Sequence, residues 1–162
     1  MSAEGMGRVT AAEVARHPFF HGVAGSRVAR LATAAAVEEI PAGRRIFEEH
    51  EVAEYFWLLR SGTVALDMSV PGRGTVIVET LAASSVLGWS WLFPPHRWRF
   101  GAVATGPVDA LRFDGRLVRT FCAADHDLGY DLAMRFGTLM LDRLAATRIR
   151  LLDLYARPGE RP

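Results

Sequence analysis

One stretch of the sequence combines arginines, indoles and small residues in a way that suits an anionic ligand. Gly88–Ser90 is followed, after a pair of prolines, by Arg97, Trp98 and Arg99. An arginine pairs with phosphate or carboxylate through two parallel hydrogen bonds, and a serine hydroxyl can donate to the same oxygens. A glycine gives the backbone the freedom to turn beside such a group. We therefore treat this stretch as the candidate ligand site.

The direction of Trp98 decides what this stretch can do. In an extended strand Arg97 and Arg99 share one face, and Trp98 takes the other. If the arginines face inward, an anion site is present, whereas an inward Trp98 fills the pocket or makes it a stacking surface. Aromatic residues usually serve as core, so the competing interpretation is that five aromatic residues here are simple packing: Trp89, Trp91, Phe93, Trp98 and Phe100.

Other residue groups with catalytic or metal-binding chemistry are few. His17 and His21 are four residues apart, but no third metal ligand is evident. The acidic run Glu48–Glu51 around His50 lies where a metal-dependent enzyme of the cupin type would need ligands, yet the histidine spacing of cupins is absent. Cys122 has no basic partner that would make it a nucleophile. We predict neither a catalytic residue nor a metal site.

Composition limits the class of protein that has to position these residues. The chain has 162 residues, of which 50% are hydrophobic and 23% charged, with a net charge of +1. This length and composition predict one domain with a core of its own. The balanced charge gives no case for binding DNA or an anionic membrane. A single cysteine and the lack of a long apolar run favour the cytoplasm, without a membrane segment.

The character of the chain changes twice along its length. Thr10–Val37 is rich in alanine and predicts helices, with a capping box at Thr10 and a second helix, Arg27–Ala36, capped by Ser26. The segment from Ile40 to Phe113 reads as short strands separated by turns, which predicts an antiparallel sandwich or barrel. The predicted strands are Arg44–Glu48, Tyr55–Arg60, Thr63–Val70, Thr75–Leu81, Trp98–Thr105 and Val108–Phe113.

The C-terminal part is again predicted to be helical. A short helix, Asp114–Phe121, precedes a long one, Asp127–Tyr155, capped by Asp125 or Asp127. The long helix would span about 40 Å, which is more than one small domain needs. It carries one apolar stripe for its own barrel, Leu132, Phe136 and Leu139. A second seam has the spacing of a coiled coil and predicts a homodimer: Ala133, Gly137, Met140, Leu144, Thr147, Leu151 and Leu154.

The order of these elements resembles the cyclic nucleotide-binding domain of the catabolite activator family. The stretches that carry the resemblance are His17–Val23, Ile40–Glu51, Tyr55–Leu66, Val86–Phe113 and Met140–Leu152. The resemblance implies an α+β fold, in which an antiparallel β-roll (a double-stranded β-helix, jelly-roll-like) lies between N-terminal helices and a long C-terminal helix. The implied divisions are a flexible N-terminus (1–9), the roll domain (10–126), the dimerisation helix (127–156) and a tail (157–162).

The family's phosphate-binding cassette is altered in this sequence. In the family pattern a glutamate follows the glycine and an arginine pairs with the cyclic phosphate, but here Trp89 follows Gly88 and the arginine position falls on Trp98. Thr147 lies where the family places a hydroxyl against the purine, and His50 replaces a usual glycine. The resemblance thus implies candidate ligand contacts at Gly88, Trp89, Ser90, Arg97, Trp98, Arg99 and Thr147. It also implies altered or lost affinity for cyclic AMP and cyclic GMP.

Three function classes remain open on the sequence. The first is a stand-alone regulatory module that senses a nucleotide or a related anion and signals through a protein partner, since no helix-turn-helix domain follows before Pro162. The second is a ligand-free scaffold or dimerisation domain whose pocket is plugged by Trp89 and Trp98. The third is an enzyme of the cupin type. Direct DNA binding is not expected, because Asp142 and Asp153 offset the arginines of the long helix, which resemble a solvated face: Arg143, Arg148 and Arg150.

Overall fold

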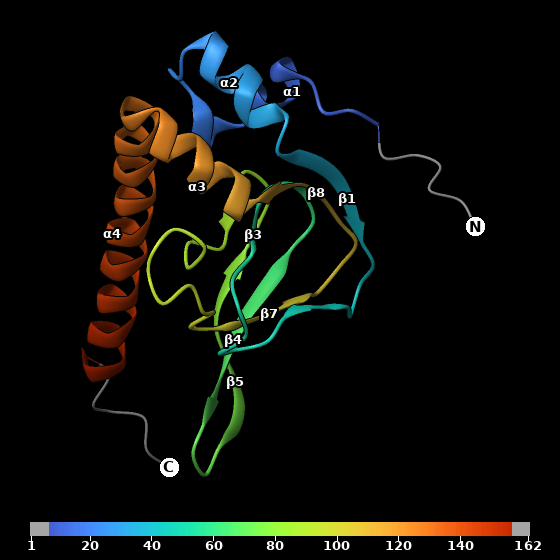
Figure 1. The fold of residues 1–162 in the computed structure, drawn as a ribbon. Helices are drawn as coiled ribbons and strands as arrows, with labels where there is room; N and C mark the ends of the chain where they lie inside the picture. Colours follow the sequence, from blue (N-terminus) through green and yellow to red (C-terminus); the bar gives the residue numbers. More distant parts are fainter. Residues whose placement is uncertain (1–6, 157–162) are drawn as a thin grey trace.

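A computed structural model describes residues 7–156 of the chain (Figure 1). The predicted tail, Arg157–Pro162, and the first six residues of the predicted loose N-terminus lie outside the described residues. Arg8 already belongs to the fold, because it forms an isolated antiparallel bridge with Ala36.

Three short helical segments precede the first strand. They are α1 (Ala11–Arg16), the 3₁₀ segment η1 (Pro18–Phe20) and α2 (Gly25–Ala32). The capping box is confirmed, since the Glu13 backbone N–H donates to Thr10 Oγ1 over 3.2 Å and Thr10 N–H donates to Glu13 Oε2 over 2.7 Å. Ser26 is not a cap, because α2 begins at Gly25, two residues before the predicted start, and follows Ala24 without a side-chain cap.

The predicted second helix is too long at its C-terminal end. The chain turns at Thr33, and Ala35 and Ala36, the last residues of the predicted helix, instead begin strand β1 (Ala35–Ile40). This strand pairs antiparallel with β8 from Ala35 to Ile40. Hydrogen bonds to a neighbouring strand thus outweigh the helix propensity of the alanines, which is a weak preference.

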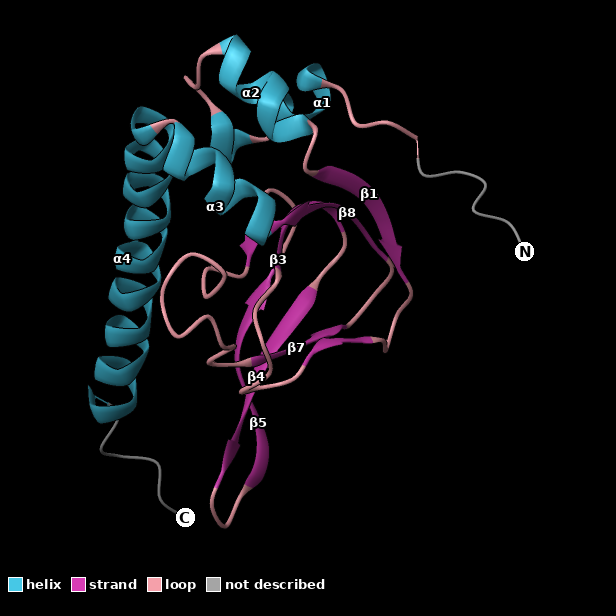
Figure 2. Cartoon of the chain, viewed as in Figure 1, coloured by secondary structure: helices cyan, strands magenta, loops and turns pink. Residues whose placement is uncertain are grey.

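The strands form two four-stranded antiparallel sheets that make the β-roll (Figure 2). One sheet has the order β1-β8-β3-β6 and the other β2-β7-β4-β5. The remaining strands are β2 (Arg45–Phe47), β3 (Tyr55–Ser61), β4 (Val64–Val70), β5 (Gly74–Leu81), β6 (Val86–Leu87), β7 (Gly101–Ala104) and β8 (Val108–Asp114). This architecture confirms the predicted α+β fold with an antiparallel roll.

The segment just before β7 differs from the prediction. The predicted strand Trp98–Thr105 starts only at Gly101, and Trp98 instead pairs with the loop between β2 and β3. The Trp98 backbone N–H donates to the Glu51 carbonyl over 2.9 Å, and the His50 N–H donates to the Trp98 carbonyl over 2.8 Å. Two hydrogen bonds therefore hold this residue against the opposite loop.

The two C-terminal helices are α3 (Gly115–Ala124) and α4 (His126–Ala156). The Asp114 carboxylate caps α3 by accepting from the backbone N–H groups of Arg116 and Leu117. Asp125 accepts from the Leu128 N–H at the start of α4 over 3.3 Å, in agreement with one of its two predicted caps. Figure 1 shows α1, α2 and α3 at one end of the roll and α4 running along its side.

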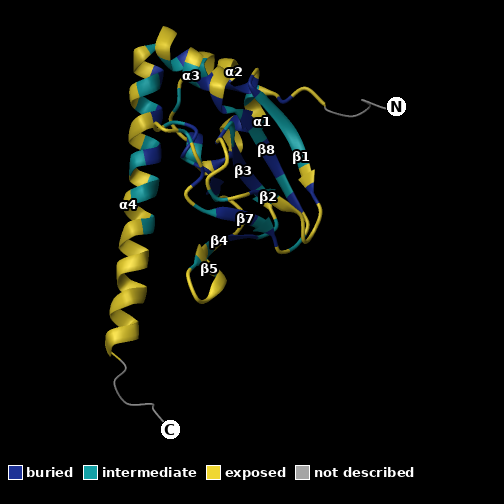
Figure 3. Ribbon diagram, turned by 60° about the horizontal axis from the view of Figure 1, so that its bottom comes forward, coloured by how far each residue is buried: buried dark blue, intermediate teal, exposed yellow. Residues whose placement is uncertain are grey.

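Only the first half of α4 is buried against the rest of the chain. Leu128, Leu132 and Phe136 are fully buried and Leu139 packs against the core, which confirms the predicted stripe facing the roll. From Leu141 onward every residue except Arg143 is exposed, as the yellow lower part of the helix in Figure 3 shows. Among residues 7–156, no helix is both long and apolar enough to cross a membrane.

Candidate functional site

The loop between β6 and β7 brings most of the predicted ligand residues together. Gly88, Trp89, Ser90, Trp98 and Arg99 line a cavity of about 20 Å³ beside α4. Its other walls come from Phe47, Leu66, Leu87, Phe100 and Arg143. A space of this size holds about one water molecule. The inner end of the candidate site is therefore almost completely filled by protein.

Trp98 is the residue that fills it. Its side chain is turned inward and only 5% exposed, whereas Arg97 and Arg99 are exposed. The indole stacks on Phe47 with ring centroids 3.8 Å apart and planes 10° apart. Of the two orientations left open by the sequence, the structure has the one in which the tryptophan faces the core. The competing interpretation of aromatic packing therefore applies to Trp98.

The other aromatic residues of this loop divide between core and surface. Trp91 is fully buried, while Trp89 and Phe100 are partly buried and Phe93 is 37% exposed. The loop consists of turns and one isolated bridge, and no helix occurs within residues 88–100. Ser90, predicted as a hydroxyl donor to an anion, is buried next to Trp89 in this loop.

Position 88 requires glycine for two reasons, its backbone conformation and the closeness of the Trp98 ring. Its φ is +93°, a conformation that L-residues with a side chain rarely adopt. A Cβ added here would lie 2.8 Å from both Cη2 and Cζ3 of Trp98. The predicted turn at Gly88 is thus present, and the missing side chain leaves the space that the Trp98 indole occupies.

Arg143 of α4 lies at the site, although the sequence did not predict this. It was expected on a solvated helix face, but its side chain is only 11% exposed. Its guanidinium donates to the Val86 carbonyl, lies 4.7 Å from the centre of the Trp89 ring and is 3.9 Å from Glu79. Burial lowers the pKa of Arg143, and the nearby carboxylate opposes that shift. These contacts bind α4 directly to the loop.

The spacing of residues along the helix could have predicted that Arg143 faces the roll. Leu132, Phe136, Leu139 and Arg143 follow one another at intervals of four, three and four residues, which places all four on the side of α4 that faces the roll. An arginine can extend such a stripe when its charged group finds partners at the far end of its aliphatic stem. The apolar stripe alone ended at Leu139 and therefore missed it.

A second pocket of about 150 Å³ lies on the outer side of the same loop. It is lined by Trp89, Ser90, Phe93, Pro95, Arg97, Arg99 and Met140. Both predicted arginines thus line this outer pocket, and Arg99 also lines the small inner cavity beside Trp98. Thr147 lines neither pocket, because it is exposed and its hydroxyl donates to the Arg143 carbonyl one turn earlier, over 2.9 Å.

The histidines considered as metal ligands have roles in packing or in the backbone. The His17 ring is buried, with Nε2 3.2 Å from the Leu59 carbonyl and Nδ1 accepting from the Phe19 N–H. Burial lowers the pKa of His17 and so favours the neutral ring. His50 adopts a φ of +73° in the place where the family usually has glycine. Within the described part of the chain, no three His, Cys, Asp or Glu side chains are grouped to hold a metal ion.

Cys122 is half-buried and packs against the core. Burial raises the pKa of its thiol, and the nearby Asp125 carboxylate acts in the same direction. Both effects disfavour the thiolate, which is the reactive form. This environment agrees with a packing role for the side chain.

The antiparallel roll, the glycine turn and the loop between β6 and β7 beside α4 are the features that the resemblance to the cyclic nucleotide-binding domain implied. The sequence profile of the cyclic nucleotide-binding domain matches residues 37–125, more than half of the chain. The chain therefore belongs to the cyclic nucleotide-binding domain family. A comparison with curated protein sequences gives no significant match.

Solved structures show the same fold. A proposed cyclic nucleotide-binding protein of Geobacter metallireducens GS-15 is 24% identical, with a TM-score of 0.77 over 84% of this chain and 98% of its own. A cyclic nucleotide-binding domain of Methylobacillus flagellatus KT is 19% identical, with a TM-score of 0.74 over 87% and 78%. The catabolite activator protein of Thermus thermophilus is 22% identical, with a TM-score of 0.66 over 86% of this chain and 63% of its own.

Proposed function

We propose that the protein is a regulatory module that does not bind cyclic AMP or cyclic GMP in the usual place of its family. In this proposal it senses a related anionic ligand and passes the signal to a protein partner. The observation that carries the proposal is the inward Trp98, which leaves about 20 Å³ beside Gly88. A cyclic nucleotide needs far more space than one water molecule occupies. A cytoplasmic location and the division of the chain at residue 126 stay predictions.

The chemistry of the loop supports the loss of cyclic nucleotide affinity. Trp89 follows Gly88, and its indole has a donor but no acceptor for a ribose hydroxyl. Arg97 is turned away from the core and donates to the His50 carbonyl over 3.0 Å. The arginines remain available on the outer pocket of about 150 Å³. An anion held there would contact the loop and α4 at Met140 together.

Calorimetry with cyclic AMP and cyclic GMP tests the first part of this proposal. We expect dissociation constants weaker than about 1 mM for both, equivalent to a binding free energy of only about −4 kcal/mol. The physical reason is that binding would first have to expel the Trp98 indole from its stack on Phe47. Tight binding of either nucleotide that is abolished by Arg97→Ala would contradict the proposal.

The same titration separates the sensor from the alternative, a ligand-free scaffold whose pocket is plugged by Trp89 and Trp98. AMP and pyrophosphate serve as probes of the outer pocket. Saturable binding that disappears in the double variant Arg97→Ala, Arg99→Ala supports the sensor. No binding of either probe to the folded protein supports the scaffold, which the filled inner cavity also favours.

We propose further that α4 forms the interface of a homodimer through Asp127–Tyr155. The predicted seam is open in the single chain, since Leu144, Leu151 and Leu154 are 47%, 52% and 77% exposed. Several other apolar side chains of the same half-helix are equally uncovered: Leu141, Ile149, Leu152 and Tyr155. A second copy of α4 packed along the seam would remove Leu144, Leu151 and Leu154 from water.

Substitution of the seam tests the dimer. Leu144→Asp with Leu151→Asp is expected to convert the dimer to a monomer in sedimentation equilibrium, because each buried carboxylate costs several kcal/mol. The matched control is Arg148→Asp with Asp142→Leu, exposed positions of the same helix that lie outside the predicted seam. A wild-type protein that is monomeric at about 100 µM, a concentration that would populate a dimer of micromolar affinity, would contradict the interface.

A further inference from the structure

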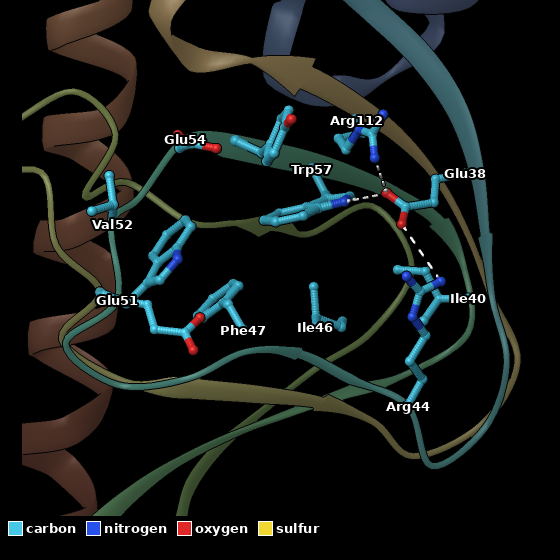
Figure 4. Close-up of a pocket in the computed structure, with 12 residues that line it drawn as sticks. Glu38, Ile40, Arg44, Ile46, Phe47, Glu51, Val52, Glu54, Trp57 and Arg112 are labelled. Atoms are coloured by element: carbon cyan, nitrogen blue, oxygen red, sulfur yellow. Dashed lines mark hydrogen bonds and ion pairs between the residues drawn. The ribbon is translucent and has the colours of Figure 1, made fainter.

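A larger cavity of about 250 Å³ lies between the two sheets of the roll (Figure 4). Phe47 and Trp98 line both this cavity and the small one beside α4, so these two rings form the wall between them. No residue of α4 contributes to the larger cavity. Its side chains come instead from β1, β2, β3, β8 and the loop between β2 and β3, with Arg44 from the turn before β2 and Trp98 from the loop between β6 and β7.

One end of this cavity carries two arginines that form ion pairs with the same carboxylate, Glu38. The Nη1 atoms of Arg112 and Arg44 lie 3.6 Å and 3.9 Å from the Glu38 carboxylate. Both distances are too long for hydrogen bonds. Among the residues from 7 to 156, neither guanidinium donates a hydrogen bond to a protein acceptor. Two guanidinium groups share the single Glu38 carboxylate, so one positive charge is left over and N–H donors remain for a carboxylate or phosphate at this end of the cavity.

The opposite end carries a carboxylate. Figure 4 shows Glu51 across the cavity from Arg44 and Arg112, with the side chains of Phe47 and Ile46 between them. Glu54 also lines the cavity, but its carboxylate already pairs with Arg116. Glu51 accepts only a long contact of 3.5 Å from the Glu48 backbone N–H. It is therefore the acidic group available to a ligand.

Aromatic side chains line the space between the two ends. Trp57 is 4% exposed, and its Nε1–H donates to Glu38 over 2.9 Å, which holds the indole in place. Tyr55 lies beside it, with the Arg112 guanidinium 4.7 Å from its ring centre. Aromatic faces of this kind pack well against a planar ring.

We propose that this cavity binds a small, flat amino acid whose carboxylate and ammonium groups lie at opposite ends of a ring. The carboxylate contacts Arg112 and Arg44, the ammonium contacts Glu51 and the ring lies against Trp57. Of the residues that line this site, Trp98 alone belongs to the loop between β6 and β7, and the site shares no arginine with that loop. It therefore does not rest on the function proposed above.

The zwitterion 4-(aminomethyl)benzoate is the probe, because its charged groups stand on opposite sides of one ring. Titration followed by calorimetry and tryptophan fluorescence is expected to show saturable binding of one molecule per chain. Two analogues each lack one charge: 4-methylbenzoate has no ammonium and benzylamine has no carboxylate. Each should bind about tenfold more weakly, the usual worth of one charged hydrogen bond.

Two variants test which residue contacts the carboxylate of the ligand and which contacts its ammonium group. Arg112→Gln should weaken the zwitterion and 4-methylbenzoate about tenfold and leave benzylamine unchanged, because only the carboxylate contact is lost. Glu51→Gln should weaken the zwitterion and benzylamine and leave 4-methylbenzoate unchanged. Arg73→Gln, which removes the same charge from the exposed turn between β4 and β5, is the control and should change none of the three.

Two outcomes would overturn this site. One is the absence of saturable binding of the zwitterion at about 10 mM, where even a very weak complex would form. The other is binding that neither Arg112→Gln nor Glu51→Gln alters. If Arg112→Gln prevents folding, Arg44→Gln takes its place, because the Arg44 side chain is 56% exposed and its loss leaves the roll intact.

Discussion

Trp98→Ala is expected to lower the free energy of unfolding by about 3–5 kcal/mol, the usual cost of removing a buried tryptophan side chain. The indole is 5% exposed and stacks on Phe47, and it separates the small cavity beside α4 from the larger one between the sheets. Its removal would join the two spaces and leave a void that the hydrogen-bonded loop at Glu51 cannot easily close.

Urea denaturation of the wild type and the variant measures this effect. The control is Phe93→Ala, which truncates another aromatic residue of the same loop that is 37% exposed. We expect that change to cost about 1 kcal/mol or less, as surface substitutions usually do. Equal effects of the two substitutions would show that Trp98 does not fill the site in the way the structure describes.

Gly88→Ala is expected to destabilise the protein by about 2–5 kcal/mol. A left-handed backbone costs an L-residue about 1–2 kcal/mol, and an extra methyl group in a packed core adds about 1–3 kcal/mol. Both costs apply here, because φ is +93° and the new Cβ would lie 2.8 Å from two carbons of the Trp98 ring.

Two controls separate the backbone cost from the steric cost. Gly43 has a φ of +83°, and a Cβ added there would have no atom within 4 Å, so Gly43→Ala reports the backbone cost alone. Introducing Gly88→Ala into the Trp98→Ala variant removes the clash, so its additional cost should fall to that of Gly43→Ala. A coupling of about 1–3 kcal/mol is expected for residues in contact. Simple additivity would contradict the proposed packing of the indole against the glycine.

In the loop between β6 and β7, a local sequence pattern predicts part of the arrangement of the side chains. Alternation along the chain correctly separated Arg97 and Arg99 from Trp98, because neighbouring side chains in an extended segment point to opposite faces. The same alternation is satisfied by either direction of Trp98. The choice depends on Phe47, which is distant from Trp98 in sequence, and on the turn at Gly88, and both contact the indole only in the folded roll.

The N-terminal region contains one feature that depends on neighbouring residues and one that depends on a distant strand. The capping box at Thr10 was predictable because its partner, Glu13, is three residues away and the two hydrogen bonds are local. The end of the second helix was not, because Ala35–Ile40 becomes a strand by pairing with β8, more than sixty residues later. An alanine-rich segment follows its helix propensity only where no such partner is available.

Turn glycines, the short strands of the roll and the inward stripe of the last helix follow from interactions between residues close in sequence, and residue order was enough to predict them. The filled site beside Gly88, the buried Arg143 and the charged cavity around Glu38 and Arg112 required the folded chain. Each of these joins side chains from different strands, loops or helices. Burial and charge pairing at such places depend on how the elements pack, which no local pattern of residue types specifies.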